Sequence, residues 1–181
     1  ELARMAKSND ILLLQEVTLS DGVQEVLHAA GLRWILASSF SINDTDIGVL
    51  TASRAVPIAS CAQRTPEPLL RLPKSAMITW LRVKDSTETL AIANVHAINF
   101  TLVVDDYRAQ FDALAGVLAL HRGPIILGGD LNTWSEARAA AVRDVAVKLG
   151  LVEVAYADDR RSRFLGRQVD YVFVRGLEVI T

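Results

Sequence analysis

The chain has 181 residues, of which 51% are hydrophobic and 22% are charged, and its formal net charge is −2 at pH 7. This length supports one domain with a single core and is too short for two ordinary domains. The longest unbroken apolar run, residues 113–120, is too short to cross a bilayer, and the apolar content excludes a disordered chain. The single cysteine, Cys61, excludes an internal disulfide framework and a zinc site built on several thiolates.

The first half of the chain predicts a mostly β structure with one amphipathic helix. The chain begins like the middle of a helix, and the apolar run 11–14 predicts a short buried strand. Residues 21–30, ended by Gly31, predict a helix. Runs rich in β-branched and aromatic residues predict strands at 33–37, 47–52, 56–62, 74–83 and 89–95. Both alternating faces of 74–83 are apolar, which is typical of a strand buried between two layers.

In the second half, helical patterns alternate with short strands. The stripe Tyr107, Phe111, Leu114 and Leu118 predicts a helix that ends before Gly123-Pro124, and residues 125–127 predict a strand. The segment 133–136 fits a capping box, followed by a helix that reaches Gly150. Two last strands are expected at 151–155 and 169–174. The element order therefore indicates a layered α/β sandwich, with two packed sheets covered outside by helices.

Polar side chains follow several of these apolar strands. Glu16, His96, Asp130 with Asn132, and Asp170 stand at or near strand ends, where side chains meet at a shared rim. Carboxylate and amide oxygens suit a hard cation such as Mg²⁺ or Mn²⁺, and poorly suit structural zinc. We expect glycines 128 and 129 to let the backbone approach a ligand, and the helix after Asn132 to point its positive end toward an anion.

Each of these residues also has an ordinary structural interpretation. Glu16 could be a solvated glutamate at a strand exit, and Asp130 with Asn132 could be turn and capping residues. His96 could be a hydrogen-bonded structural histidine, and Asp170 could pair with water, a backbone amide or an arginine. An arginine cluster near the C-terminus could be a solvated loop with internal ion pairs; it comprises Arg160, Arg161, Arg163 and Arg167.

Four blocks, taken in order, resemble the signature segments of a known superfamily. They are 10–17 (Asp-Ile-Leu-Leu-Leu-Gln-Glu-Val), 94–97 (Asn-Val-His-Ala), 128–134 (Gly-Gly-Asp-Leu-Asn-Thr-Trp) and 169–174 (Val-Asp-Tyr-Val-Phe-Val). This pattern is similar to that of the endonuclease/exonuclease/phosphatase superfamily, and segments 68–76, 96–100 and 158–167 resemble its bacterial YafD-like branch. The resemblance implies a DNase I-like four-layer α/β sandwich, with two packed, mostly antiparallel mixed β-sheets flanked by helices.

The resemblance also implies roles for single residues. Glu16 matches the metal-binding glutamate, and Asp130 and Asn132 match the pair that holds the attacking water and the phosphate. His96 matches the phosphate-contacting histidine, and Asp170 matches the aspartate that orients a general-base histidine. Candidate contacts to the substrate phosphate are Arg71, Asn99, Arg161 and Arg163. The implied activity is hydrolysis of phosphate esters by in-line water attack with Mg²⁺ or Mn²⁺; the alternative is a non-catalytic binding module that retains the fold.

Two family segments have no counterpart in residues 1–181: a first strand with an active-site asparagine, and a closing Ser-Asp-His segment with the base histidine. His28 and His121 lie in helical segments and do not replace that histidine. We therefore expect residues 1–181 to form a single truncated domain that alone folds marginally and hydrolyses little. The net charge of −2 leaves nucleic acid, phospholipid and inositol phosphate open as substrates. We expect a monomer without an evident protein partner and a cytoplasmic location.

Overall fold

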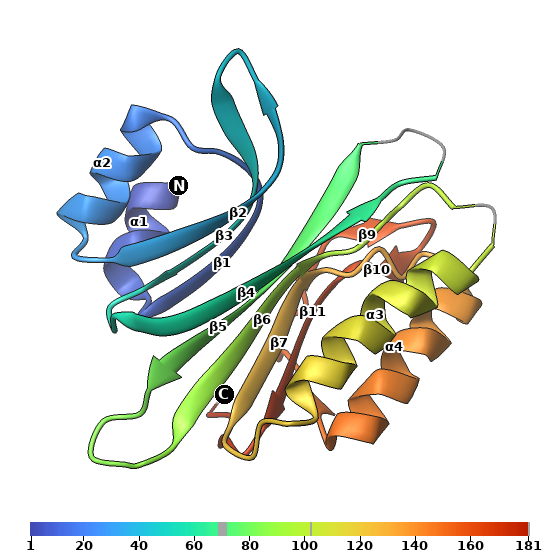
Figure 1. Ribbon diagram of the computed structural model, residues 1–181. Coiled ribbons are helices and arrows are strands. Elements are labelled where there is room, and N and C mark those ends of the chain that lie inside the picture. Colours follow the sequence, from blue (N-terminus) through green and yellow to red (C-terminus); the bar gives the residue numbers. More distant parts are fainter. Residues whose placement is uncertain (69–71, 102, 181) are drawn as a thin grey trace.

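The computed structural model describes residues 1–68, 72–101 and 103–180. Its helices and strands form four layers, with two helices, a three-stranded sheet, a six-stranded sheet and two further helices stacked in that order (Figure 1). This arrangement confirms the four-layer α/β sandwich that the sequence predicts. Among the described residues, no helix is long and apolar enough to cross a membrane.

The N-terminal part forms the smaller sheet and its helical cover. Strands β1 (Ile11–Thr18), β3 (Thr45–Ser53) and β2 (Arg33–Ile42) pair antiparallel in that spatial order. Helices α1 (Leu2–Ser8) and α2 (Asp21–Ala29) pack on one face, where Leu12, Leu27, Leu32 and Leu50 are buried together. The predicted helix at 21–30 and the helical N-terminus are both present, and the strand expected at 11–14 extends to Thr18.

The larger sheet carries the second core. Its spatial order is β4 (Pro57–Pro66), β5 (Pro73–Arg82), β6 (Thr89–His96), β7 (Ile125–Asp130), β11 (Asp170–Arg175) and β8 (Val152–Glu153). Strands β6 and β7 pair parallel, the other described pairs of this sheet are antiparallel, and helix α3 (Asp105–Leu118) connects β6 to β7. Helices α3 and α4 (Glu136–Leu149) cover the outer face, and a short hairpin of β9 (Arg163–Phe164) and β10 (Arg167–Gln168) follows β8.

Strand β5 is buried on both faces, as its sequence predicts. Ala76 and Ile78 belong to the core under α3 and α4, whereas Met77 packs between the two sheets against Ala37 and Val49. Side chains alternate across a strand, so neighbouring residues of β5 serve different cores. Strand β5 therefore contributes both to the core under α3 and α4 and to the packing between the two sheets.

Two local expectations are wrong. Thr133 does not cap α4, because its hydroxyl donates to the Gln168 carbonyl at 2.7 Å, and Ser135 takes the capping position instead. The helix consequently begins at Glu136, farther from Asn132 than expected. The strand expected at 151–155 shortens to Val152–Glu153, because only two of its residues pair with β11.

The glycines of β7 allow this strand to pack closely against its neighbours. Gly129 has φ of +135°, and a Cβ atom built on it would lie 2.1 Å from the Val95 carbonyl oxygen of β6. A Cβ on Gly128 would lie 3.0 Å from the Tyr171 carbonyl oxygen of β11 and 3.2 Å from the Leu13 side chain of β1. Both glycines therefore permit close packing of β7 against its neighbours.

We expect Gly129→Ala to destabilise the protein by about 3 kcal/mol or more, because the added methyl meets backbone and the backbone angle disfavours alanine. Gly116→Ala is the matched control, since that glycine is exposed in α3 with no atom near the added Cβ. The control should stabilise the protein by about 0.5–1 kcal/mol. Urea unfolding of both variants measures the difference, and equal stability of Gly129→Ala and wild type would contradict the expectation.

Candidate active site

Three of the polar residues singled out in the sequence lie in one row of the larger sheet. His96 of β6 is the paired position of Asp130 in β7, and Asp130 is the paired position of Asp170 in β11. Paired positions on neighbouring strands place their side chains on the same face of a sheet. The parallel pairing of β6 and β7 therefore brings His96 and Asp130 together, and the antiparallel return of β11 adds Asp170.

The row faces the gap between the two sheets. Two residues before His96, the Asn94 side chain donates to the Leu50 carbonyl of β3 at 2.9 Å and accepts from Gln15 of β1 at 2.7 Å. Because side chains on a strand alternate, His96 points to the same side as Asn94. The site therefore lies at the mouth between the sheets, where β1 and β3 approach the row.

A β-bulge in β1 brings Glu16 to this mouth. Between the pairs Leu14–Leu50 and Val17–Gly48, β1 contains one residue more than β3, and Glu16 has φ of +52°. Bulges of this kind re-aim a side chain and often occur beside functional sites. Oε1 of Glu16 lies 3.7 Å from Nε2 of His96, which in turn lies 3.6 Å from Oδ2 of Asp130. Strands β1, β6 and β7 thus contribute to one cluster.

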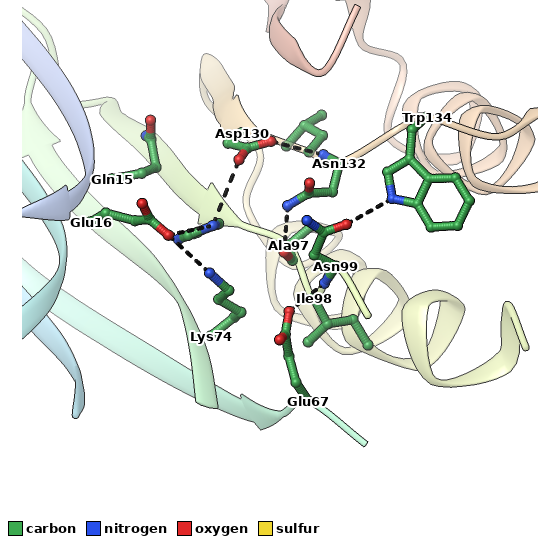
Figure 2. Close-up of polar contacts among 12 residues, drawn as sticks. Gln15, Glu16, Glu67, Lys74, Ala97, Ile98, Asn99, Asp130, Asn132 and Trp134 are labelled. Atoms are coloured by element: carbon green, nitrogen blue, oxygen red, sulfur yellow. Dashed lines mark hydrogen bonds and ion pairs between the residues drawn. The ribbon is translucent and has the colours of Figure 1, made fainter. Parts of the chain in front are cut away.

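Lys74, at the start of β5, supplies a positive charge to the cluster. Its ammonium group donates to Oε1 of Glu16 at 3.1 Å, as Figure 2 shows. This hydrogen bond lowers the pKa of Glu16, so its carboxylate is ionised. Burial, with a further contribution from Lys74, lowers the pKa of His96 to about 4, so the imidazole is neutral near pH 7. In the sequence Lys74 follows Arg71 by three residues. The proximity of Lys74 to Glu16 could not be predicted without the fold.

Asp130 and Asn132 form a tight turn at the end of β7. The Asn132 backbone amide donates to Oδ1 of Asp130 at 3.0 Å, and the Asn132 side-chain nitrogen donates to the Ala97 carbonyl at 2.9 Å (Figure 2). Asn132 has φ of +49°, a conformation that asparagine tolerates better than most residues. Burial, and less strongly the charge of Asp170, raises the pKa of Asp130 to about 6. The turn therefore holds a partly desolvated carboxylate at the mouth.

A cavity of about 250 Å³ adjoins this cluster on the side of the smaller sheet. Glu16, Lys74 and His96 line it together with Ser39 and Phe40 of β2. Strand β2 also contains one extra residue, between Ser38 and Phe40, at the level where β1 bulges. The two bulges flank β3 and open the space in which a small charged group can reach the cluster.

Asn99 lies just beyond β6 and beside the turn. Its Oδ1 accepts a hydrogen bond from the Trp134 indole at 2.8 Å, and its backbone amide donates to Oε1 of Glu67 at 2.6 Å (Figure 2). Figure 2 shows the Asn99 side chain between Trp134 and Asn132. The structure thus places this predicted phosphate contact at the edge of the cluster.

The arginines expected to contact the substrate phosphate lie in different surroundings. Arg161 donates to Asp159 at 2.9 Å and to Glu153 at 2.8 Å, and its guanidinium lies over the ring of Tyr171. Arg163 is exposed on β9, and Arg71 lies outside the described residues. The other two arginines of the cluster pair with carboxylates; these ion pairs are Arg160 with Asp158 and Arg167 with Glu136. Among the residues that the structure describes, none of these arginines forms a hydrogen bond or an ion pair with Glu16, His96 or Asp130.

Asp170 closes the row on the side of β11. Its Oδ2 accepts a hydrogen bond from the Ser162 backbone amide at 3.2 Å, and its side chain borders a hollow of about 420 Å³ between β1 and β11. His121 contacts the Pro124 carbonyl at 3.1 Å, and His28 lies in α2. Neither histidine reaches Asp170, as the sequence indicates.

The residues present suit a cation that uses few protein ligands. Within residues 1–68, 72–101 and 103–180, no group of three or more histidine, cysteine, aspartate or glutamate residues could hold a metal ion. Glu16 is ionised, its side chain is 70% exposed, and Lys74 contacts only its Oε1. Mg²⁺ commonly binds through one or two carboxylates together with water and substrate phosphate. The donor chemistry of Glu16 fits this mode and does not fit a closed structural site.

Comparisons with known proteins place the chain in a family. A profile described as the Endonuclease/Exonuclease/phosphatase family matches residues 1–181. A UPF0294 protein of Yersinia pseudotuberculosis is 39% identical over 179 residues, which cover 99% of this chain and 68% of the relative. A UPF0294 protein of Vibrio parahaemolyticus is 38% identical, with 98% of this chain and 63% of the relative covered. The chain thus spans about two thirds of the length of these relatives.

Solved structures show the same fold at low identity. The human Nocturnin catalytic domain with bound sulfate has a TM-score of 0.70 and 20% identity, covering 91% of this chain and 68% of that chain. ANGEL2, a 2′,3′-cyclic phosphatase, has a TM-score of 0.70 and 14% identity, covering 96% and 71%. At these identities the likeness concerns the fold alone, and together with the family match it confirms the resemblance stated from the sequence.

The raised pKa of Asp130 predicts a pH-dependent effect on stability. Its folded pKa of about 6 exceeds the ordinary value of 3.8, so the folded state keeps this proton longer than the unfolded state does. Stability is therefore lost as pH rises from about 4 to about 6, and the loss is constant above that range. Asp130→Asn removes this carboxylate. Its free energy of unfolding, compared with that of wild type, should therefore rise by about 1–3 kcal/mol as the pH increases from 4 to 7.

Urea unfolding in EDTA at several pH values measures this gain. Asp144→Asn on the exposed surface of α4 is the control, because its carboxylate lies in a surface ion pair with Arg108. A difference between Asp130→Asn and wild type that stays constant from pH 4 to pH 7 would show that Asp130 has no raised pKa.

Proposed function

The chain belongs to the Endonuclease/Exonuclease/phosphatase family. From this premise we propose that it acts as a divalent-metal-dependent hydrolase of phosphate esters. The observation that carries the proposal is the convergence of Glu16, His96 and Asp130 from three separate strands at one mouth between the sheets. Separate structural roles would not require these three side chains to meet, with 3.7 Å between Glu16 and His96 and 3.6 Å between His96 and Asp130.

Glu16 is the proposed ligand of the metal ion. Enzymes of this family generally use divalent metal ions, and Mg²⁺ or Mn²⁺ suits an oxygen ligand of this kind. When bound, such an ion polarises a phosphoryl oxygen and offsets the negative charge that develops on it. The exposed Glu16 carboxylate leaves room for water and substrate oxygens beside the ion.

The remaining residues are proposed to handle the water and the phosphoryl group. The Asp130 carboxylate accepts a hydrogen bond from the attacking water, and Asn132 helps to position that water and the phosphate. The neutral His96 donates a hydrogen bond to the phosphoryl group as charge builds up, and the Lys74 ammonium adds a fixed positive charge. Asp170 would orient a general-base histidine supplied from outside residues 1–181.

The proposal extends to phosphate esters as a class. ANGEL2 is a 2′,3′-cyclic phosphatase, and the Nocturnin domain binds sulfate, so this fold accommodates oxyanions. DNA, RNA, phospholipid and inositol-phosphate substrates form the panel that would identify the substrate. The expectations of a cytoplasmic location, a monomer and no protein partner belong to the same proposal and rest on the sequence alone.

The central test is hydrolysis of bis(4-nitrophenyl) phosphate by the full-length protein with Mg²⁺ or Mn²⁺. We expect EDTA to abolish turnover and Asp130→Ala to lower kcat by at least about 100-fold, because the water loses its carboxylate. Asp144→Asn should leave kcat unchanged. Unchanged turnover in Asp130→Ala would refute the mechanism. Binding of inorganic phosphate without any turnover by wild type would instead favour the non-catalytic binding module.

Lys74→Gln should change metal binding and turnover in opposite directions. Lys74 competes with a cation for the Glu16 carboxylate, so its removal should tighten Mn²⁺ binding by several-fold. It also removes a positive charge near the phosphoryl group, so kcat should fall by about tenfold or more. Calorimetric titration with Mn²⁺ and steady-state kinetics measure the two effects. If kcat and the affinity for Mn²⁺ both stayed unchanged, Lys74 would have no part in the site.

A further inference from the structure

Asn99 has three of its four polar groups fixed by three different segments. Its backbone amide donates to Glu67 at 2.6 Å, its backbone carbonyl accepts from Arg138 at 2.6 Å, and its Oδ1 accepts from Trp134 at 2.8 Å. Within the part of the chain that the structure describes, its Nδ2 group donates to no other residue. Figure 2 shows this nitrogen on the side of the Asn99 amide that faces Asn132.

The Trp134 indole determines which way the amide points. An indole N–H can only donate a hydrogen bond, so the group that meets it must be the amide oxygen and not the amide nitrogen. The nitrogen consequently lies on the other side of the amide, which in Figure 2 is the side of Asn132. A donor in this position suits an anionic oxygen and repels a cation.

A buried arginine holds Trp134 and the loop in place. Arg138 is only 2% exposed, and its guanidinium carbon lies 4.5 Å from the ring centroids of both Trp134 and Tyr107. Its donors reach the carbonyls of Ile98 at 2.7 Å and Asn132 at 3.3 Å. The same side chain therefore stacks on the indole and joins the loop after β6 to the turn after β7.

Resting on the proposed function, we infer that Trp134 is a positioning residue that sets the Asn99 amide to donate to a phosphoryl oxygen of the substrate. Arg138 and Glu67 keep Asn99 at the edge of the cluster, and Trp134 selects the donor face of its amide. This assigns to Trp134 a role in phosphate recognition that requires no contact between Trp134 and the substrate. It also predicts that Trp134 acts only through Asn99.

A double-mutant cycle tests the inference in the full-length protein. Trp134→Phe keeps an aromatic ring for Arg138 and removes the N–H donor; it should lower kcat/KM for bis(4-nitrophenyl) phosphate by about 3- to 10-fold and weaken inhibition by inorganic phosphate similarly. Asn99→Ala should lower kcat/KM by about 10- to 100-fold. In the Asn99→Ala background, Trp134→Phe should have no further effect. Trp34→Phe, in a half-buried tryptophan of β2, should change neither quantity.

A spectroscopic measurement separates positioning from general packing. Asn99→Asp keeps an acceptor for the indole and loses the donor, so the Trp134 indole N–H resonance should stay near its wild-type shift while phosphate inhibition weakens. In Asn99→Ala the same resonance should move upfield, because the hydrogen bond is lost. Urea unfolding of each variant reports whether a loss of activity follows a loss of fold.

The outcomes distinguish the inference from the proposed function. If Trp134→Phe lowers kcat/KM by the same factor with and without Asn99, Trp134 acts by packing and the inference is wrong. The inference is equally wrong if Trp134→Phe leaves both turnover and phosphate inhibition unchanged. If wild type does not hydrolyse any phosphate ester, the proposed function fails, while calorimetric binding of inorganic phosphate to the same variants still tests the Asn99 donor.

Discussion

The parallel pairing of β6 and β7 is the constraint on which the candidate site depends. Gly129 allows these strands to approach so closely that a single methyl group would meet the Val95 carbonyl. This approach places His96 and Asp130 at paired positions, and β11 extends the row to Asp170. Burial then acts on the row, because it keeps His96 neutral and raises the pKa of Asp130. The chemistry of these groups therefore follows from the packing of strands.

Most of the fold could be predicted from the sequence, because apolar periodicity reports burial directly. The two apolar faces of β5 indicated a strand between layers, and Ala76 and Met77 serve different cores. The stripe through Tyr107 and Phe111 gave α3, which packs on the larger sheet. The positions of His96 and Asp130 at strand ends indicate a shared rim, and the parallel pairing of β6 and β7 places both side chains at it.

The rest of the site depends on contacts between segments far apart in the chain. Lys74 reaches Glu16 only because the start of β5 lies near the end of the bulged β1, and no local pattern marks this contact or the bulge. The misplaced helix cap has the same origin, since Thr133 bonds to Gln168, a residue that follows α4. The Trp134 side chain combines an aromatic ring with a polar N–H group, which suits an exposed loop position as well as a hydrogen bond to Asn99. Its residue type alone therefore does not indicate the contact with Asn99.

The bulge in β1 divides the strand into two parts and shifts the alternation of its side chains by one residue. Before it, Leu12 contributes to the core under the N-terminal helices; after it, the chain has taken one additional step relative to β3. Removal of one residue at this point would give a more regular ladder and a less strained backbone at position 16. Because side chains alternate along a regular strand, β1 without the extra residue would not present both Gln15 and Glu16 to the larger sheet, so the irregularity that weakens the ladder also places a second polar side chain beside β6.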